Sequence, residues 1–80
     1  MEELLVGEKS KLRGIALENS GIRQDMNIII VAIRKKGGKM LFNPSSKALI
    51  EIGDTLIALG YAKELARLAS ILLGKKTGKD

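Results

Sequence analysis

The sequence predicts an α+β domain, a two-layer sandwich with the element order β-α-β-β-β-α and an antiparallel hairpin. Residues 28–33 form an unbroken apolar run rich in β-branched side chains, and a glycine-containing turn follows it. Residues 62–73 instead repeat apolar side chains at helical spacing. A chain of 80 residues has room for one modest core, so the hairpin and the helices are expected to share it.

The first half of the chain predicts a strand, a short helix and a second, longer strand. Residues 4–6 are a short apolar run. Residues 15–21 have the pattern of a short helix, with Ile15 and Leu17 pointing inward and Gly21 as a left-handed cap. Residues 28–34 then give the strongest strand signal in the chain.

The middle of the chain predicts a hairpin and a further strand. Gly37 and Gly38 provide the turn, and residues 39–42 return as the antiparallel partner of the long strand. Asn43-Pro44 ends that partner, because proline cannot donate to a ladder. Residues 55–59 are the last expected strand.

The C-terminal helix is expected over residues 62–73, and the domain over residues 1–73. Residues 74–80, which hold three of the lysines, are expected to form a flexible basic tail. The stripe expected to face the core consists of Ala62, Leu65, Ala66, Ala69, Leu72 and Leu73.

Composition restricts the function class. The chain contains no Cys and no His, which removes the usual zinc ligands and the common nucleophile–base pairs. We therefore expect no enzyme activity, no catalytic residue, no metal site and no cofactor. The formal net charge is +5, of which the last seven residues supply +2 and the rest of the chain a mild +3, and only one Phe and one Tyr are present. Nucleic-acid binding usually needs a clustered basic face or stacking aromatics, so no nucleic-acid partner is expected.

The strand at residues 28–33 lacks the alternation of a strand with one buried and one wet face. Either both faces are covered within the monomer, one under each helix, or the second face meets an identical chain. Two helices, one of them short, would cover a sheet of three or four strands incompletely, which favours the second reading. We therefore expect a homodimer with an isologous interface formed by Ile28, Ile30 and Ala32 or by their alternates.

Four motifs in register resemble the TrkA C-terminal domain, which is the C-lobe of RCK-type regulators of potassium conductance. They are S-x-L-x-G at 10–14, GIRxxxxIIIVAIRKKGG at 21–38, NP at 43–44 and IEIGDTLIALG at 50–60. The resemblance implies a cytoplasmic regulatory lobe that senses a ligand, dimerises and controls potassium transport from the inner face of the membrane. It also implies two partners, a membrane-embedded potassium channel or transporter subunit and a Rossmann-type lobe.

In several members of that family the effector is cyclic di-AMP, bound at the dimer seam. The resemblance places the corresponding pocket along the stretch that leads into the second strand, with one residue closing it from the hairpin partner. Arg23 would pair with a phosphate there, and the isoleucines would form apolar walls for adenine. Two alternatives stay open: an arginine that only lies on the surface, and a ligand-free dimerisation module of another cation transporter or antiporter. The candidate residues are Ile22, Arg23, Asn27, Ile28, Ile29, Ile30 and Pro44.

Overall fold

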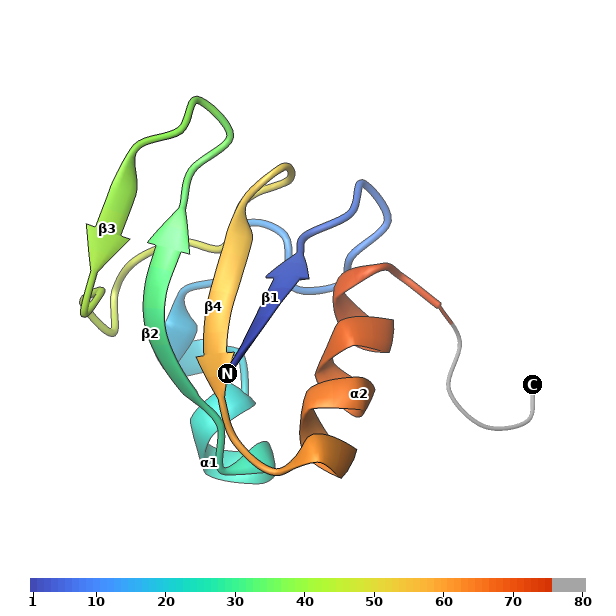
Figure 1. Ribbon diagram of the computed structural model, residues 1–80. Helices are drawn as coiled ribbons and strands as arrows, with labels where there is room; N and C mark the ends of the chain where they lie inside the picture. The colour runs from blue at the N-terminus through green and yellow to red at the C-terminus, as the bar shows by residue number, and fades with distance from the viewer. Residues whose placement is uncertain (76–80) are drawn as a thin grey trace.

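The computed structural model, which describes residues 1–75, has the predicted order of strands and helices with one added 3-10 turn. Figure 1 shows the four strands side by side, with the short helix at their lower end and the longer helix to their right. The elements are β1 (Glu2–Leu5), η1 (Leu17–Asn19), α1 (Ile22–Met26), β2 (Ile29–Arg34), β3 (Met40–Phe42), β4 (Thr55–Leu59) and α2 (Ala62–Leu72).

The strands form one antiparallel sheet in the order β1-β4-β2-β3, with a bulge at Val31 of β2. Ile30 lies opposite Ala58 of β4, whereas Ala32 lies opposite Ile57. Because Ala58 and Ile57 point to opposite faces, the bulge places Ile30 and Ala32 on opposite faces too. The bulge therefore accounts for part of the missing alternation in this strand.

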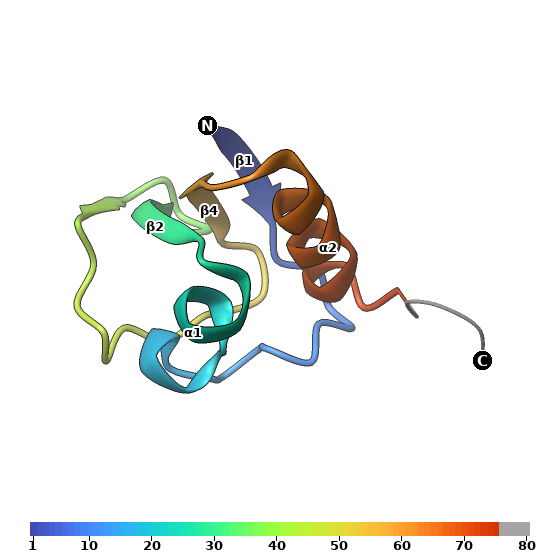
Figure 2. The same cartoon turned by 90° about the horizontal axis from the view of Figure 1, so that it is seen from below.

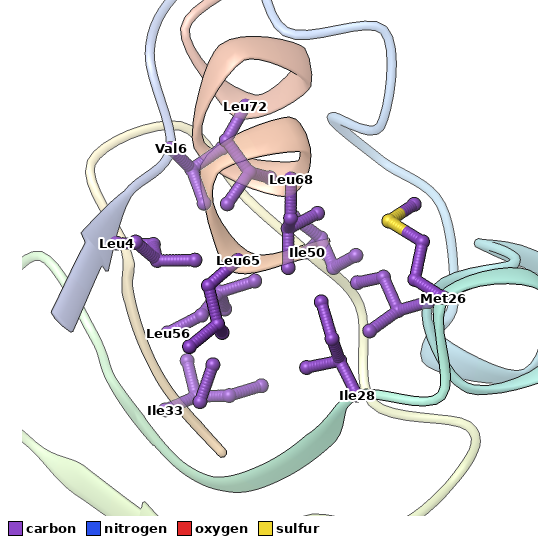
Figure 3. Close-up of a cluster of buried hydrophobic side chains, with 12 residues drawn as sticks. Leu4, Val6, Met26, Ile28, Ile33, Ile50, Leu56, Leu65, Leu68 and Leu72 are labelled. Carbon is purple, nitrogen blue, oxygen red and sulfur yellow. The ribbon is translucent and has the colours of Figure 1, made fainter. Parts of the chain in front are cut away.

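Both helices cover the same face of the sheet, as the view from below shows (Figure 2). The alternative in which each helix covers a different face of the sheet is therefore wrong. In β4 the alternation is clear: Leu56 and Ala58 are fully buried, while Thr55 and Ile57 are partly exposed. The core between sheet and helices contains no aromatic side chain and consists of Leu4, Val6, Ile22, Met26, Ile28, Ile33, Ile50, Leu56, Ala58, Leu65, Leu68 and Leu72 (Figure 3).

The other face of the sheet carries no helix in the part of the chain that the structure describes, and we call it the open face. It exposes four large apolar side chains, each between 47% and 77% accessible: Leu5, Ile29, Phe42 and Leu59. An ion pair crosses it, in which Arg34 Nη2 donates to Glu3 Oε1 at 2.8 Å.

Two residues that were expected at a dimer interface are buried within the monomer. Ile28 is 1% exposed and belongs to the core, so its expected place in the interface is wrong. Ala32 is on the open face but is only 4% exposed. Ile30 packs against the core from its partly buried position, so Ile29 is the isoleucine of β2 most available to a partner.

The first helical region differs from the expectation of one helix over residues 15–21. Gly21, with φ of 78°, precedes α1 instead of ending a helix, and η1 comes before it. The Ser20 hydroxyl donates to Leu17 O at 2.7 Å and accepts from Ile22 N at 3.2 Å, which ends one turn and starts the next. The expected range 15–21 therefore contains only η1, and α1 begins directly after it, where no helix was predicted.

The last helix ends close to its expected boundary, but its buried stripe is narrower. Leu65, Leu68 and Leu72 are buried, and Leu68, absent from the expected stripe, replaces the exposed Ala62 and Ala66. Leu73 is 42% exposed because it lies beyond the helix end. The expected basic tail falls mostly on residues 76–80, which lie outside the described residues.

A buried carboxylate joins the end of β2 to the segment before β4. Asp54 is 1% exposed, and its Oδ2 accepts from Lys35 Nζ at 2.6 Å and from Glu51 N at 3.0 Å. Lys35 Nζ also donates to the more exposed Glu51 Oε1 at 2.8 Å. Desolvation by burial lowers the pKa of Lys35, but hydrogen bonds and charge attraction from Asp54 and Glu51 outweigh it and raise that pKa above 10.5.

Candidate effector groove

A groove of about 340 Å³ lies where α1 and η1 face the start of β2 and the segment after β3. Its floor is the stretch from Ile28 to Ile30, and its walls are the two helical turns on one side and the segment 43–46 on the other. The lining residues are Leu17, Glu18, Ile22, Arg23, Gln24, Ile28, Ile29, Ile30, Asn43, Pro44 and Ser46.

Short-range backbone bonds fix the helical wall against the floor. Asn27, with φ of 54°, ends α1 in a left-handed conformation that asparagine tolerates, and its N–H donates to Arg23 O. The next residue, Ile28, donates its N–H to Ile22 O at 3.2 Å. The chain thus turns sharply from α1 into β2, and Arg23 and Ile29 line the same groove.

The opposite wall is held by the end of β3 and by η1. Asn43, with φ of 46°, donates its N–H to Val31 O at 2.9 Å, and Pro44 then leads the chain away from the sheet. Glu18 N donates to Ser46 O at 2.8 Å, which ties the segment 43–46 back to η1. Because β3 is short, β2 has no strand partner on this side at its start, and Ile29 lies at a free edge.

The groove combines apolar surface with one exposed cation, Arg23, and one exposed carboxylate, Glu18. Ile22 and Ile28 are nearly fully buried, so they shape its base, whereas Ile29 is 47% exposed and Ile30 is partly exposed. The Arg23 side chain is exposed and makes no hydrogen bond or ion pair with the described residues. A concave apolar site with a few polar groups is the usual form of a small-molecule site, and a free guanidinium favours an anionic one.

Six of the seven residues expected from the sequence line this groove, and Asn27 does not. Asn27 is exposed beside it, at the end of α1. Sequence reasoning missed five lining residues, which are Leu17 and Glu18 of η1, Gln24 of α1, and Asn43 and Ser46 on either side of the predicted Pro44. The Asn43-Pro44 pair was the signal for the wall opposite the helical turns, since it marked where β3 ends.

Residues 1–75 contain neither a candidate metal site nor a candidate membrane span. No group of three or more Asp, Glu, His or Cys side chains in that range could hold a metal ion. No helix of that range combines the length and apolar character needed to cross a bilayer.

Two curated relatives are potassium transport proteins. The chain is 32% identical to the K(+)/H(+) antiporter subunit KhtT of Bacillus subtilis, over 85% of this chain and 41% of that protein. It is 36% identical to potassium channel protein 1 of Methanocaldococcus jannaschii, over 72% of this chain and 17% of that one. The chain thus spans less than half the length of either relative.

Solved structures with the same fold include two cyclic di-AMP complexes. The RCK_C domain dimer of Streptococcus agalactiae BusR with c-di-AMP has a TM-score of 0.79 and 27% identity, covering 89% of this chain and 92% of that one. The KtrA RCK C domain with c-di-AMP has a TM-score of 0.75 and 33% identity, and the match covers 86% of this chain and 78% of the KtrA chain. A further structure, of BusR with its promoter DNA, is 27% identical to this chain with a TM-score of 0.79. The match covers 89% of this chain and 35% of the BusR chain. The match to the TrkA-C domain family extends over residues 1–73, and this chain belongs to that family.

Proposed function

We propose that this domain is a cytoplasmic regulatory lobe of a potassium channel or transporter, and that it works as a homodimer that senses an anionic effector. The groove supports this proposal most directly, because it joins an unpaired Arg23 to apolar walls. The candidate effector is cyclic di-AMP, which the BusR and KtrA domains hold in their structures. The partners would be a membrane-embedded potassium channel or transporter subunit and a Rossmann-type lobe.

The size of the groove fits half of a symmetric dinucleotide. A volume of about 340 Å³ is near the lower end for small-molecule sites. A two-fold axis would add the groove of a second copy and supply a second Arg23, so each adenosine half would meet one protomer. The isoleucines would pack on the base, Arg23 would pair with a phosphate, and Asn27 and Pro44 would border the ligand.

Ile29 links this ligand site to the expected dimer. It lines the groove, and it also lies opposite Leu59 on the open face. A seam along the start of β2 would therefore cover exposed apolar surface and close the groove together. A second candidate function, a dimerisation module without a ligand, is favoured by the open face alone, because Leu5, Phe42 and Leu59 lie outside the groove.

Calorimetric titration of cyclic di-AMP tests the effector. Loss of a desolvated charge-assisted bond costs about 2–5 kcal/mol, so Arg23→Ala should weaken binding at least about 30-fold. Arg67→Ala is the matched control: it removes an equal charge from α2, where Arg67 pairs with Glu64 at 3.2 Å. Its affinity should stay within about twofold of wild type.

The result separates the two functions. If wild type binds and Arg23→Ala binds equally well, the effector lies elsewhere. If wild type gives neither heat nor a thermal shift with millimolar ligand, the domain is a dimerisation module without this effector.

A further inference from the structure

Four segments far apart in the sequence lie in a row on the side of the molecule away from α1, from the hairpin tip at the upper left of Figure 1 to the end of α2 at the right, and we call this side the basic end. The segments are the loop 7–14, the hairpin tip 35–39, the segment 51–54 and the residues 73–75 that follow α2 (Figure 1). Gly7 N donates to Leu72 O at 2.8 Å, and Gly53 N donates to Val6 O at 2.9 Å. A Cβ added at Gly53 would lie 2.9 Å from Cδ of Lys36, so the hairpin tip and the segment 51–54 are also in contact.

The net charge of the described residues is concentrated at this end. Its four segments hold seven cations and three carboxylates, a formal surplus of four, while the rest of residues 1–75 holds five of each. Two of the three carboxylates, Glu51 and Asp54, are already bonded to Lys35. The remaining six cations of the basic end are exposed: Lys9, Lys11, Arg13, Lys36, Lys39 and Lys75.

Two exposed aliphatic side chains lie among these cations. Ile52 and Leu73 are each 42% exposed, in the segment 51–54 and directly after α2. A Cβ added at Gly7 would touch the Leu73 side chain at 3.6 Å, which places Leu73 against the loop that carries Lys9 and Lys11. Apolar side chains flanked by lysines are the pattern with which peripheral proteins meet a bilayer interface.

We propose that the basic end docks on the surface of an anionic phospholipid bilayer, with Ile52 and Leu73 in the headgroup region. Five of the six cations are lysines, which act as hydrated point charges and suit a diffuse anionic surface better than bidentate recognition. The two aromatics that could stack on bases, Phe42 and Tyr61, lie in β3 and before α2, outside the four segments. Direct lipid contact goes beyond the proposed effector sensing, because it needs neither Arg23 nor the groove.

Vesicle co-sedimentation of the 80-residue chain tests the proposal. One vesicle preparation is pure phosphatidylcholine, and the other contains one part phosphatidylglycerol to two parts phosphatidylcholine. The test variant is Lys11→Glu/Lys39→Glu, since neither side chain bonds to another described residue. The control is Lys47→Glu/Lys63→Glu, which changes the net charge equally at exposed sites away from the basic end.

Wild type should bind the anionic vesicles, and added salt should weaken binding. Each lysine near an anionic surface changes partitioning about fivefold, so the test variant should lose at least about tenfold and the control less than about threefold. Leu73→Ser should also weaken binding without a change in charge. Absence of binding by wild type, or equal losses in both charge variants, would overturn the proposal. A third result would also overturn it: wild type binds duplex DNA more tightly than vesicles, and only Lys11→Glu/Lys39→Glu loses the DNA binding. Nucleic acid would then be the partner of the basic end.

Discussion

Replacing Asp54 by alanine should destabilise the domain more than replacing the neighbouring carboxylate Glu51. Asp54 is 1% exposed and accepts two hydrogen bonds, from Lys35 Nζ at 2.6 Å and from Glu51 N at 3.0 Å. Alanine at this position removes both bonds. It also leaves a lysine that is only 24% exposed with the more solvated Glu51 as its remaining partner.

The magnitude follows from burial. A hydrogen bond to a charged group contributes about 1.5–3 kcal/mol, and breaking a buried pair costs about 3–5 kcal/mol. Lys35 is partly solvated and keeps Glu51, so the lower part of that range applies, and we expect a loss of about 2–4 kcal/mol. For a chain of 80 residues this corresponds to a fall in Tm of about 10–20 °C.

Glu51→Ala is the matched control, because Glu51 binds the same ammonium group at 2.8 Å but its side chain is 57% exposed. Exposed ion pairs contribute about 0–1 kcal/mol, so this variant should lose less than about 1 kcal/mol. Urea unfolding followed by circular dichroism measures both variants, with equal m-values as the check that they unfold from similar states. Equal losses in Asp54→Ala and Glu51→Ala would refute the argument from burial.

The pH dependence of stability gives an independent check of the same contact. The folded-state pKa of Lys35 is raised above 10.5, so its stabilising contribution is fully present below that pH. It is lost as the pH rises through the folded-state pKa and the ammonium deprotonates. The stability difference between wild type and Lys35→Met should therefore be constant from pH 7 to pH 10 and shrink above that range. A difference that already declines between pH 7 and pH 9 would contradict the assignment.

Two further substitutions test the packing and the open face. Gly74→Ala should cost about 1–3 kcal/mol in urea unfolding, because φ is 75° and the added Cβ would lie 2.5 Å from Lys9 O, whereas Gly37→Ala, with open space around it, should cost less than about 0.5 kcal/mol. Ile29→Glu should convert a dimer to a folded monomer in analytical ultracentrifugation, while Leu49→Glu, equally exposed but outside the sheet, should remain dimeric. A wild-type monomer at high micromolar concentration would contradict the second prediction.

β2, β3 and β4 were predictable because their signals are local, whereas β1 covers residues 2–5 and not the expected 4–6. Residues 55–59 match β4 as expected, and the Gly37-Gly38 turn and Asn43-Pro44 bound β3 within one residue. The bulge at Val31 was not predictable, because it depends on how β2 pairs with β4 across a long stretch of chain. Because the bulge could not be foreseen, residues 28–33 were interpreted as a regular strand with two apolar faces.

The division of the first helical region has a different cause. An isolated window of residues 15–21 cannot show whether Gly21 ends one helix or precedes the next, since a positive φ suits both positions. The Ser20 hydroxyl decides this by bonding to both turns. The same error hid Leu17 and Glu18 from the expected site, although both line the groove.

The apolar side chains of β2 are covered in two different ways, depending on their position along the strand. Ile30 and Ile33 face the helices, so the monomer itself covers them. Ile29 remains exposed at a free edge, where the groove and the open face meet. A ligand that binds only the closed, two-fold groove must also favour the dimer, since binding to one state stabilises that state by mass action. Effector sensing and dimerisation would then be one linked equilibrium, whereas a ligand-free module would show a dimer dissociation constant that cyclic di-AMP leaves unchanged.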